Sequence, residues 1–123
     1  MWRKKSDFDN RIKYINENEP DLYLSIHLNY LNNSFYSGIQ VFAIEKNMEL
    51  AERVQKQLNK NLNSNREAKI IPVNTYMYDK LNTRGMLIEC GFLSNKKERE
   101  LLVTTEYQKR VAKEIANSIT SLF

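Results

Sequence analysis

Apolar and polar residues alternate through the run DLYLSIHLN, residues 21–29. A period of two places successive side chains on opposite faces of a strand. The leucine and isoleucine residues therefore share one face, whereas Tyr23, Ser25, His27 and Asn29 share the other. We predict a buried strand here, with His27 and Asn29 at its polar carboxyl end.

Three further apolar runs predict strands. Gly38–Ile44 follows the first strand after a connection too short for a helical crossover, so we expect it to run antiparallel to that strand. Ile70–Val73 contains Pro72, which has no N–H to donate and therefore favours a sheet edge or a strand end. The last run, Met86–Phe92, is apolar except for Glu89 and predicts a buried strand.

Apolar spacings of three and four residues predict four helices. Ser6 can cap the first, over roughly residues 7–18, and Asn47 can cap the second, which extends to about Asn61. The remaining two begin after Asn95, which has the form of a capping box with Glu98, and at Thr105. The order helix, strand, strand, helix, strand, strand, helix, helix predicts an α/β fold, a single three-layer domain with a mixed central sheet flanked by helices.

Composition limits the possible functions. The chain has 123 residues, of which 41% are hydrophobic and 28% charged, as expected for one globular domain with one core. No apolar run is long enough for a membrane span, and the N-terminus lacks the apolar stretch of a secretory signal. The net charge of +4 is spread over helical segments without a nucleic-acid recognition motif, so we expect no nucleic-acid partner and consider an anionic polymer instead.

Two polar residues in the predicted strands are candidates for chemistry. His27 is the only histidine, and in open α/β sheets functional groups gather beyond the carboxyl ends of strands. The alternative for His27 is a hydrogen-bonded, partly buried residue without a catalytic role. Glu89 lies within an apolar run, where an unpaired carboxylate is costly to bury and usually becomes neutral, pairs with a cation or meets a metal.

Neighbouring segments offer other hypotheses. Cys90 follows Glu89 and so points to the opposite face of its strand, as a small core residue would. A cysteine hydrolase using Cys90 and His27 would lack a third, orienting group. The loop at 29–37 carries two aromatic residues that could touch a sugar or a peptide, although an exposed turn is the simpler interpretation. A substrate groove could also involve residues of the later connection, namely Tyr76, Tyr78, Asp79 and Lys80.

The runs DLYLSIHLN at 21–29 and LIECGFLSN at 87–95, together with Ser37–Gly38 and Leu50–Ala51, resemble the zinc-dependent N-acetylmuramoyl-L-alanine amidases of bacterial cell walls. The chain is most similar to the germination-specific, spore-cortex branch. The resemblance implies a peptidoglycan hydrolase that cleaves the amide between the lactyl group of muramic acid and L-alanine. It also implies that the full-length protein acts outside the cytoplasmic membrane, in the cell wall or spore cortex.

The resemblance also implies roles for single residues. His27 matches the last zinc-binding histidine of the family, Glu89 matches its catalytic glutamate, and Asn29 is a candidate substrate-binding residue. The family's other two zinc ligands, a histidine and a glutamate, have no counterpart, so the Zn²⁺ site is incomplete in this chain. We therefore expect residues 1–123 to be the C-terminal portion of an amidase catalytic domain, which could associate with itself or with a partner protein. The alternative is a non-catalytic remnant that binds the cell wall or a partner.

Overall fold

The computed structural model describes residues 2–72 and 74–123. Ten elements follow one another along the chain, and their order agrees with the predicted order apart from two short helices. They are α1 (Trp2–Asn18), β1 (Tyr23–Asn29), β2 (Gln40–Ala43), the 3₁₀ helix η1 (Glu45–Asn47), α2 (Met48–Asn61), β3 (Lys69–Ile70), α3 (Tyr76–Asp79), β4 (Gly85–Phe92), α4 (Lys96–Leu102) and α5 (Thr105–Thr120).

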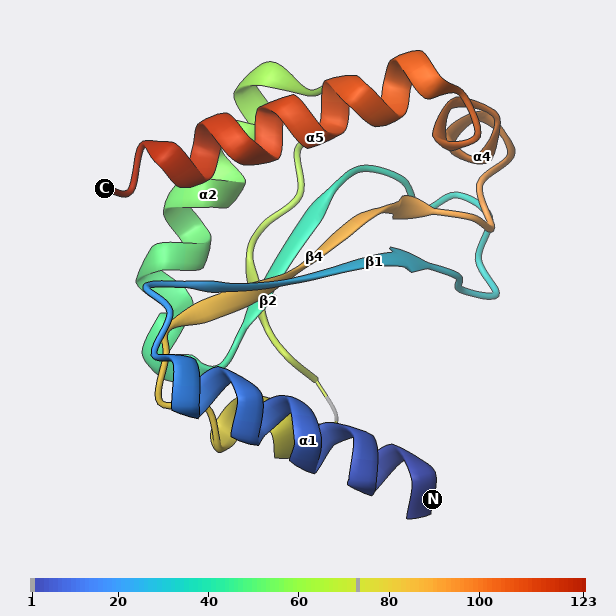
Figure 1. Cartoon of the computed structure of the whole chain (residues 1–123). Helices are drawn as coiled ribbons and strands as arrows, with labels where there is room; N and C mark the ends of the chain where they lie inside the picture. Colours follow the sequence, from blue (N-terminus) through green and yellow to red (C-terminus); the bar gives the residue numbers. More distant parts are fainter. Residues whose placement is uncertain (1, 73) are drawn as a thin grey trace.

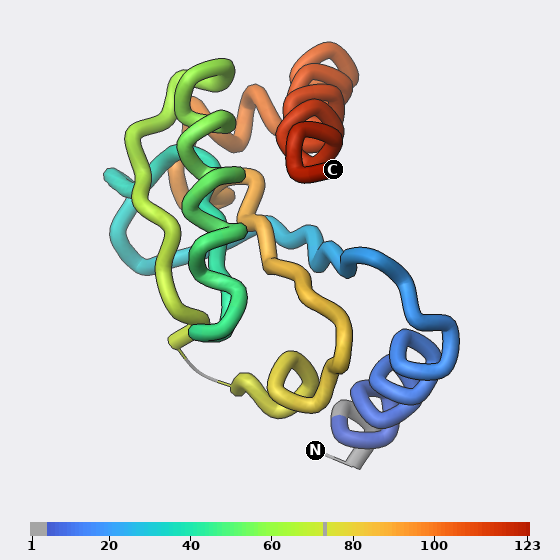
Figure 2. Tube along the Cα trace, turned by 90° about the vertical axis from the view of Figure 1, so that its left-hand side faces the viewer, coloured from blue at the N-terminus to red at the C-terminus, as the bar shows by residue number. Residues whose placement is uncertain are grey.

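The strands form one mixed sheet in the order β1-β4-β2-β3. β1 is parallel to β4, β4 is antiparallel to β2, and β2 is parallel to β3. β2 thus runs opposite to β1, as predicted, although β4 lies between them. Figure 1 shows α1 on one side of the sheet and α2 and α5 on the other, and Figure 2 shows α1 and α5 well apart at opposite ends of the view. The three-layer α/β fold is therefore confirmed.

Each face of the sheet has its own core. On the side of α2 and α5, Val41, Val54, Leu58 and Ile88 are fully buried, and three of the four residues of the predicted α2 stripe are buried here. On the other side, Tyr23 and several neighbours pack beneath α1 and α3. This second core covers the amino-terminal half of β1 and β4, so it leaves the carboxyl-terminal half of that face for the site described below.

The prediction that β1 is buried is wrong for its apolar face. Leu24, Ile26 and Leu28 are 38%, 54% and 50% exposed, because β1 is the last strand of the sheet and α5 packs against α2 and α4 instead of lying over it. An apolar groove of about 690 Å³ separates this face from α5. Ala112 and Ala116 are among the α5 residues that line the groove, and they are too small to fill it.

Several local predictions also need correction. α1 begins at Trp2, before Ser6, and ion pairs spaced four residues apart support its first turns. Asn47 precedes α2 but makes no capping hydrogen bond through its side chain. The predicted strand at 70–73 is shorter, because β3 ends at Ile70, before Pro72, and Val73 lies outside the described residues. The connection at 74–84 contains the short helix α3, which the sequence analysis did not predict.

Candidate active site

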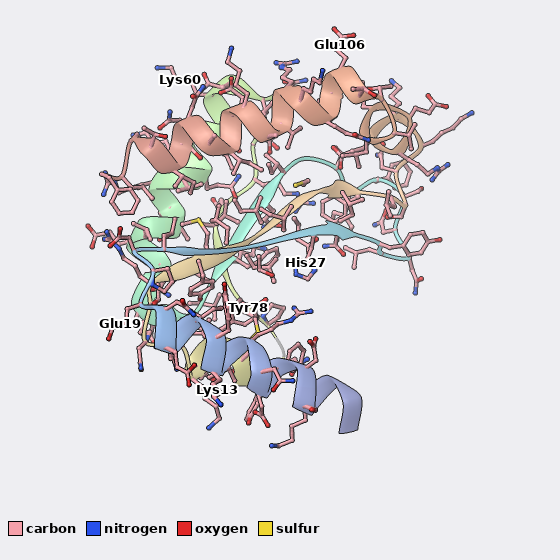
Figure 3. The ribbon with its side chains drawn as sticks, in the orientation of Figure 1. Lys13, Glu19, His27, Lys60, Tyr78 and Glu106 are labelled. Carbon is pink, nitrogen blue, oxygen red and sulfur yellow. The ribbon has the colours of Figure 1, made fainter. Side chains whose placement is uncertain are left out.

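His27 and Glu89 are direct register partners on the parallel strands β1 and β4. Paired residues of adjacent strands point to the same face, and the carboxyl ends of parallel strands meet at one edge of a sheet. The imidazole is exposed and the carboxylate is half-buried. Figure 3 shows His27 on the side of the sheet that faces α1, near Tyr78. The structure therefore brings the two predicted chemical groups together.

The Glu89 carboxylate is poorly compensated. Its Oε2 atom is buried and has no hydrogen-bond partner. Among the side chains that the structure describes, those of residues 5–72 and 74–123, no Lys or Arg forms an ion pair with Glu89. Burial raises the pKa of Glu89 above its usual range, and the neighbouring His27 acts in the opposite direction. A carboxyl group with a raised pKa is suited to accept and return a proton near neutral pH.

The His27 imidazole is held by a short chain of hydrogen bonds. Its Nε2 lies 2.7 Å from the Ser25 hydroxyl, which in turn accepts a hydrogen bond of 3.2 Å from the Tyr78 hydroxyl. Tyr78 is buried and stacks on Tyr23, with 5.9 Å between the ring centroids. Because Nε2 is already hydrogen-bonded to Ser25, Nδ1 is the ring nitrogen left for a metal ion or a substrate.

Asn29 lies at the end of β1, where the pairing with β4 becomes irregular. Its side-chain oxygen accepts a hydrogen bond of 2.8 Å from the Tyr30 amide, and its carbonyl accepts one of 2.7 Å from the Leu93 amide. Asn29 thus binds the backbone of the residues that directly follow β1 and β4. Its role in substrate binding stays a prediction.

The metal expectation can be compared with the side chains present. A catalytic zinc site uses three protein ligands. No group of three His, Cys, Asp or Glu side chains in the described part of the chain could hold a metal ion. His27 and Glu89 by themselves therefore do not fit a zinc site.

The cysteine hydrolase hypothesis is wrong. Cys90 is buried in the core on the side of α2 and α5, on the face opposite to His27. Burial raises the pKa of the Cys90 thiol to about 11. The nucleophile of such enzymes is the thiolate, which the raised pKa disfavours. Cys90 is therefore a core residue, as its position beside Glu89 indicated.

The connection at 74–84, which was expected to line a groove, packs against the core and α1. Tyr78 is in the core, and the Tyr76 hydroxyl donates a hydrogen bond of 2.6 Å to Asp9 of α1. Asp79 and Lys80 are exposed. Tyr78 therefore acts through Ser25 and does not form a groove wall.

Sequence reasoning missed the part played by Glu98. Asn95 caps α4, as predicted, through a bond of 3.0 Å to the Glu98 amide. The Glu98 carboxylate, however, is buried and accepts hydrogen bonds from the backbone amides of Gly38, at 2.8 Å, and Phe92, at 2.5 Å. A Cβ atom on Gly91 would lie 2.8 Å from that carboxylate, so glycine is required there. Gly91 was the signal in the sequence for this contact.

Comparisons with known proteins show the family to which the chain belongs. The profile of the family described as N-acetylmuramoyl-L-alanine amidase (Amidase_3) matches residues 1–121. The germination-specific N-acetylmuramoyl-L-alanine amidase of Bacillus subtilis is 41% identical over 125 residues, which cover 98% of this chain and 52% of that protein. The chain thus spans about half the length of this relative.

Solved structures give the same result. The CwlD amidase of Clostridioides difficile, solved in complex with the GerS lipoprotein, is 34% identical with a TM-score of 0.87, over 98% of this chain and 64% of that one. An N-acetylmuramoyl-L-alanine amidase of Clostridium difficile 630 is 27% identical with a TM-score of 0.82, over 93% of this chain and 63% of that one. On sequence and on fold, the chain belongs to the N-acetylmuramoyl-L-alanine amidase family.

Proposed function

We propose that this chain is the C-terminal portion of a peptidoglycan hydrolase that cleaves the amide between the lactyl group of muramic acid and L-alanine. The observation that carries the proposal is the pairing of His27 with Glu89, whose buried Oε2 atom has no partner. Family membership and the germination-specific relative support the substrate class and an action outside the cytoplasmic membrane, on the cell wall or spore cortex. No helix in the described part of the chain could cross a membrane.

Glu89 has the central role in the proposed reaction. An amide leaves as an amine only when its nitrogen receives a proton, and attack by water releases one. Glu89 takes the proton from the attacking water and delivers it to the leaving nitrogen of L-alanine. Its raised pKa supports both transfers, since the protonated and ionised forms are then closer in free energy at neutral pH. Asn29, at the end of the same strand as His27, contacts the substrate.

His27 is proposed as one ligand of Zn²⁺. Because no three suitable side chains gather in the described residues, the other ligands must come from outside them. We propose that they lie in the rest of the amidase domain, of which this chain is the C-terminal portion. The CwlD relative was solved in complex with a lipoprotein, which supports a partner protein for this chain as well, and self-association of the chain is the second proposal for its partners.

A non-catalytic function is the second candidate, and the incomplete ligand set favours it. In that case the chain binds the cell wall or a partner without hydrolysis. Incubating a longer form of the protein that carries a complete zinc site with purified sacculi and Zn²⁺, followed by mass spectrometry of the soluble fraction, separates the two. Release of peptides with a free L-alanine amine, lost in Glu89→Gln, supports the hydrolase. Binding to sacculi without release supports the second candidate.

A further inference from the structure

A polar pocket of about 390 Å³ lies beside the candidate active site, between the loop that precedes β2 and the loop that precedes β3. These loops lie next to each other in Figure 2. Its walls include Tyr36, Ser37, Gln40, Arg66 and Lys69. We call this cavity the Arg66 pocket.

The Arg66 guanidinium is held in a fixed position. Its Nε donates to the Ser37 carbonyl at 2.9 Å and its Nη1 donates to the Gln40 side-chain oxygen at 3.4 Å. Its central carbon lies 4.7 Å from the ring centroid of Phe92 and 5.3 Å from that of Tyr36. Two hydrogen bonds and two aromatic rings therefore fix the plane of the guanidinium before any ligand arrives.

The walls of the pocket are fixed as well. The Gln40 amide donates to the Glu67 carbonyl at 2.8 Å, and the Ser64 hydroxyl donates to the Ile39 carbonyl at 3.1 Å. Gly38 has φ +98, and a Cβ atom there would lie 2.8 Å from the Ser64 hydroxyl. The two loops thus pack too closely for any residue but glycine at this point, and the pocket is preformed.

The charge of Arg66 is not compensated. Over the residues that the structure describes, no carboxylate lies within 4.0 Å of its guanidinium nitrogens. Ser37 and Gln40 are neutral acceptors and use two of its five N–H groups. Lys69 adds a second positive charge to the wall, and Glu67 contributes one exposed carboxylate. The pocket therefore has a net positive charge and free donors, which favour an anionic ligand.

The position of the pocket connects it with Glu89. Gln40 on β2 is the register partner of Glu89 on β4, so both side chains point to the face that also bears His27. Gln40 is buried and accepts a hydrogen bond from Arg66. The Gln40 side chain therefore lies between Glu89 and the Arg66 guanidinium. With strands about 4.8 Å apart, this separation is roughly 10 Å, or about three residues of an extended peptide.

We propose that the Arg66 pocket is a carboxylate-binding subsite for the stem peptide of peptidoglycan. The proposal rests on the proposed amidase function, because it places the scissile amide at Glu89. With L-alanine counted as the first residue, the free carboxylate of the second or third residue then reaches Arg66, which binds it through the free N–H groups. The subsite selects peptides whose carboxylate is free over those in which it is amidated.

Binding to this chain tests the subsite without requiring catalysis. The probes are the synthetic tripeptide L-Ala–γ-D-Glu–L-Lys with free carboxylates and the same peptide with its carboxylates amidated, titrated by NMR or calorimetry. Because a charge-assisted bond to arginine is strong, we expect the acidic peptide to bind about tenfold more tightly or better. Equal affinity of the wild-type chain for the two peptides would overturn the proposal, whatever the variants show.

Variants locate the effect. Arg66→Gln should remove the preference for the acidic peptide, and Arg66→Lys should restore only part of it, since lysine lacks the planar fork of arginine. Lys60→Gln is the matched control, because it removes one positive charge from an exposed position at the end of α2 and should keep the preference. A preference that survives Arg66→Gln, or that Lys60→Gln abolishes equally, would overturn the proposal. Melting temperature and NMR spectra establish that each variant is folded.

The result can be separated from that for the amidase function. Selective binding through Arg66, together with no cleavage of muramyl peptides by a form of the protein with a complete zinc site, would support the subsite and contradict the hydrolase. Cleavage without any preference between the two peptides would support the hydrolase and contradict the subsite.

Discussion

His27 on β1 and Glu89 on β4 are direct register partners, so the imidazole and the half-buried carboxylate share one face at the carboxyl ends of two parallel strands. Neighbouring strands lie about 4.8 Å apart, which puts both groups within reach of one small substrate group. Residues far apart in the sequence thus form one site, and Gln40 extends the same row toward Arg66.

Replacing Glu89 with Gln should stabilise the chain at neutral pH. Because its pKa is raised, folded Glu89 binds its proton more tightly than unfolded Glu89 does, so the stability falls as the pH rises above the ordinary value of 4.5. Glu89→Gln removes this penalty. We expect a melting temperature higher by a few °C at pH 7 and a difference that disappears below pH 4.5.

Thermal unfolding measured across this pH range checks the prediction. The exposed Glu52 on α2 provides the control, since Glu52→Gln should leave the melting temperature nearly unchanged. A lower melting temperature for Glu89→Gln at pH 7 would mean that a stabilising partner of the ionised carboxylate exists.

The Cys90 thiol should react slowly in the folded chain. With a pKa of about 11, the thiolate fraction at pH 8 is about 10⁻³, and the core of α2 and α5 covers the sulfur. The rate of reaction with a disulfide reagent should rise about tenfold per pH unit between pH 8 and 10, and should become fast in urea. Rapid reaction at pH 7 in the native state would contradict this placement.

Removing the Glu98 carboxylate should destabilise the fold where α4 contacts Gly38 and Phe92. Glu98→Ala leaves the buried amide of Phe92 without an acceptor, at about 1–3 kcal/mol, and also the part-buried amide of Gly38, at a smaller cost. Glu98→Gln keeps one oxygen and should cost less. Gly91→Ala should also destabilise, because its Cβ would meet the carboxylate.

A double-mutant cycle between these positions tests the contact itself. Gly91→Ala should cost less in the Glu98→Ala background than in the wild-type chain, as measured by denaturant unfolding. Additive effects would show that the two residues do not act on each other.

The exposed face of β1 should cause self-association of the isolated chain. β1 has a free edge, and Leu24, Ile26 and Leu28 leave an apolar surface open beside the groove. Ile26→Lys should reduce association in sedimentation velocity at high concentration. Val103→Lys is a control, because Val103 is 71% exposed but does not line the groove. A wild-type chain that is monomeric at all concentrations would contradict the prediction.

Features set by the spacing of nearby residues could be predicted from the sequence. The spacing of Val54 and Leu58 predicted the buried face of α2, and the alternation around Glu89 and Cys90 correctly assigned their side chains to opposite faces. The exposure of Ile26 could not be predicted in this way. Alternation indicates which residues share a face, whereas burial depends on which element covers it.

The positions of Glu98 and Arg66 depend on contacts between segments that are distant in the sequence. The sequence around Asn95 and Glu98 has the form of a local capping box, yet the Glu98 carboxylate binds the amide of Gly38. Arg66 was one of many scattered basic residues until the fold placed it between Tyr36 and Phe92. Such contacts depend on tertiary packing and leave little local trace apart from the glycines.

The most direct test of the proposed function is cleavage by a longer form of the protein that carries a complete zinc site, with zinc content measured on the same samples. If Glu89 carries the proton, Glu89→Gln should keep the zinc content and lose at least about 10²-fold in the rate of muramyl–L-alanine cleavage. His27→Ala should instead lower the zinc content, because it deletes a proposed ligand. A Glu89→Gln variant that cleaves at the wild-type rate, or a zinc-loaded wild-type protein that releases no peptide, would contradict the account.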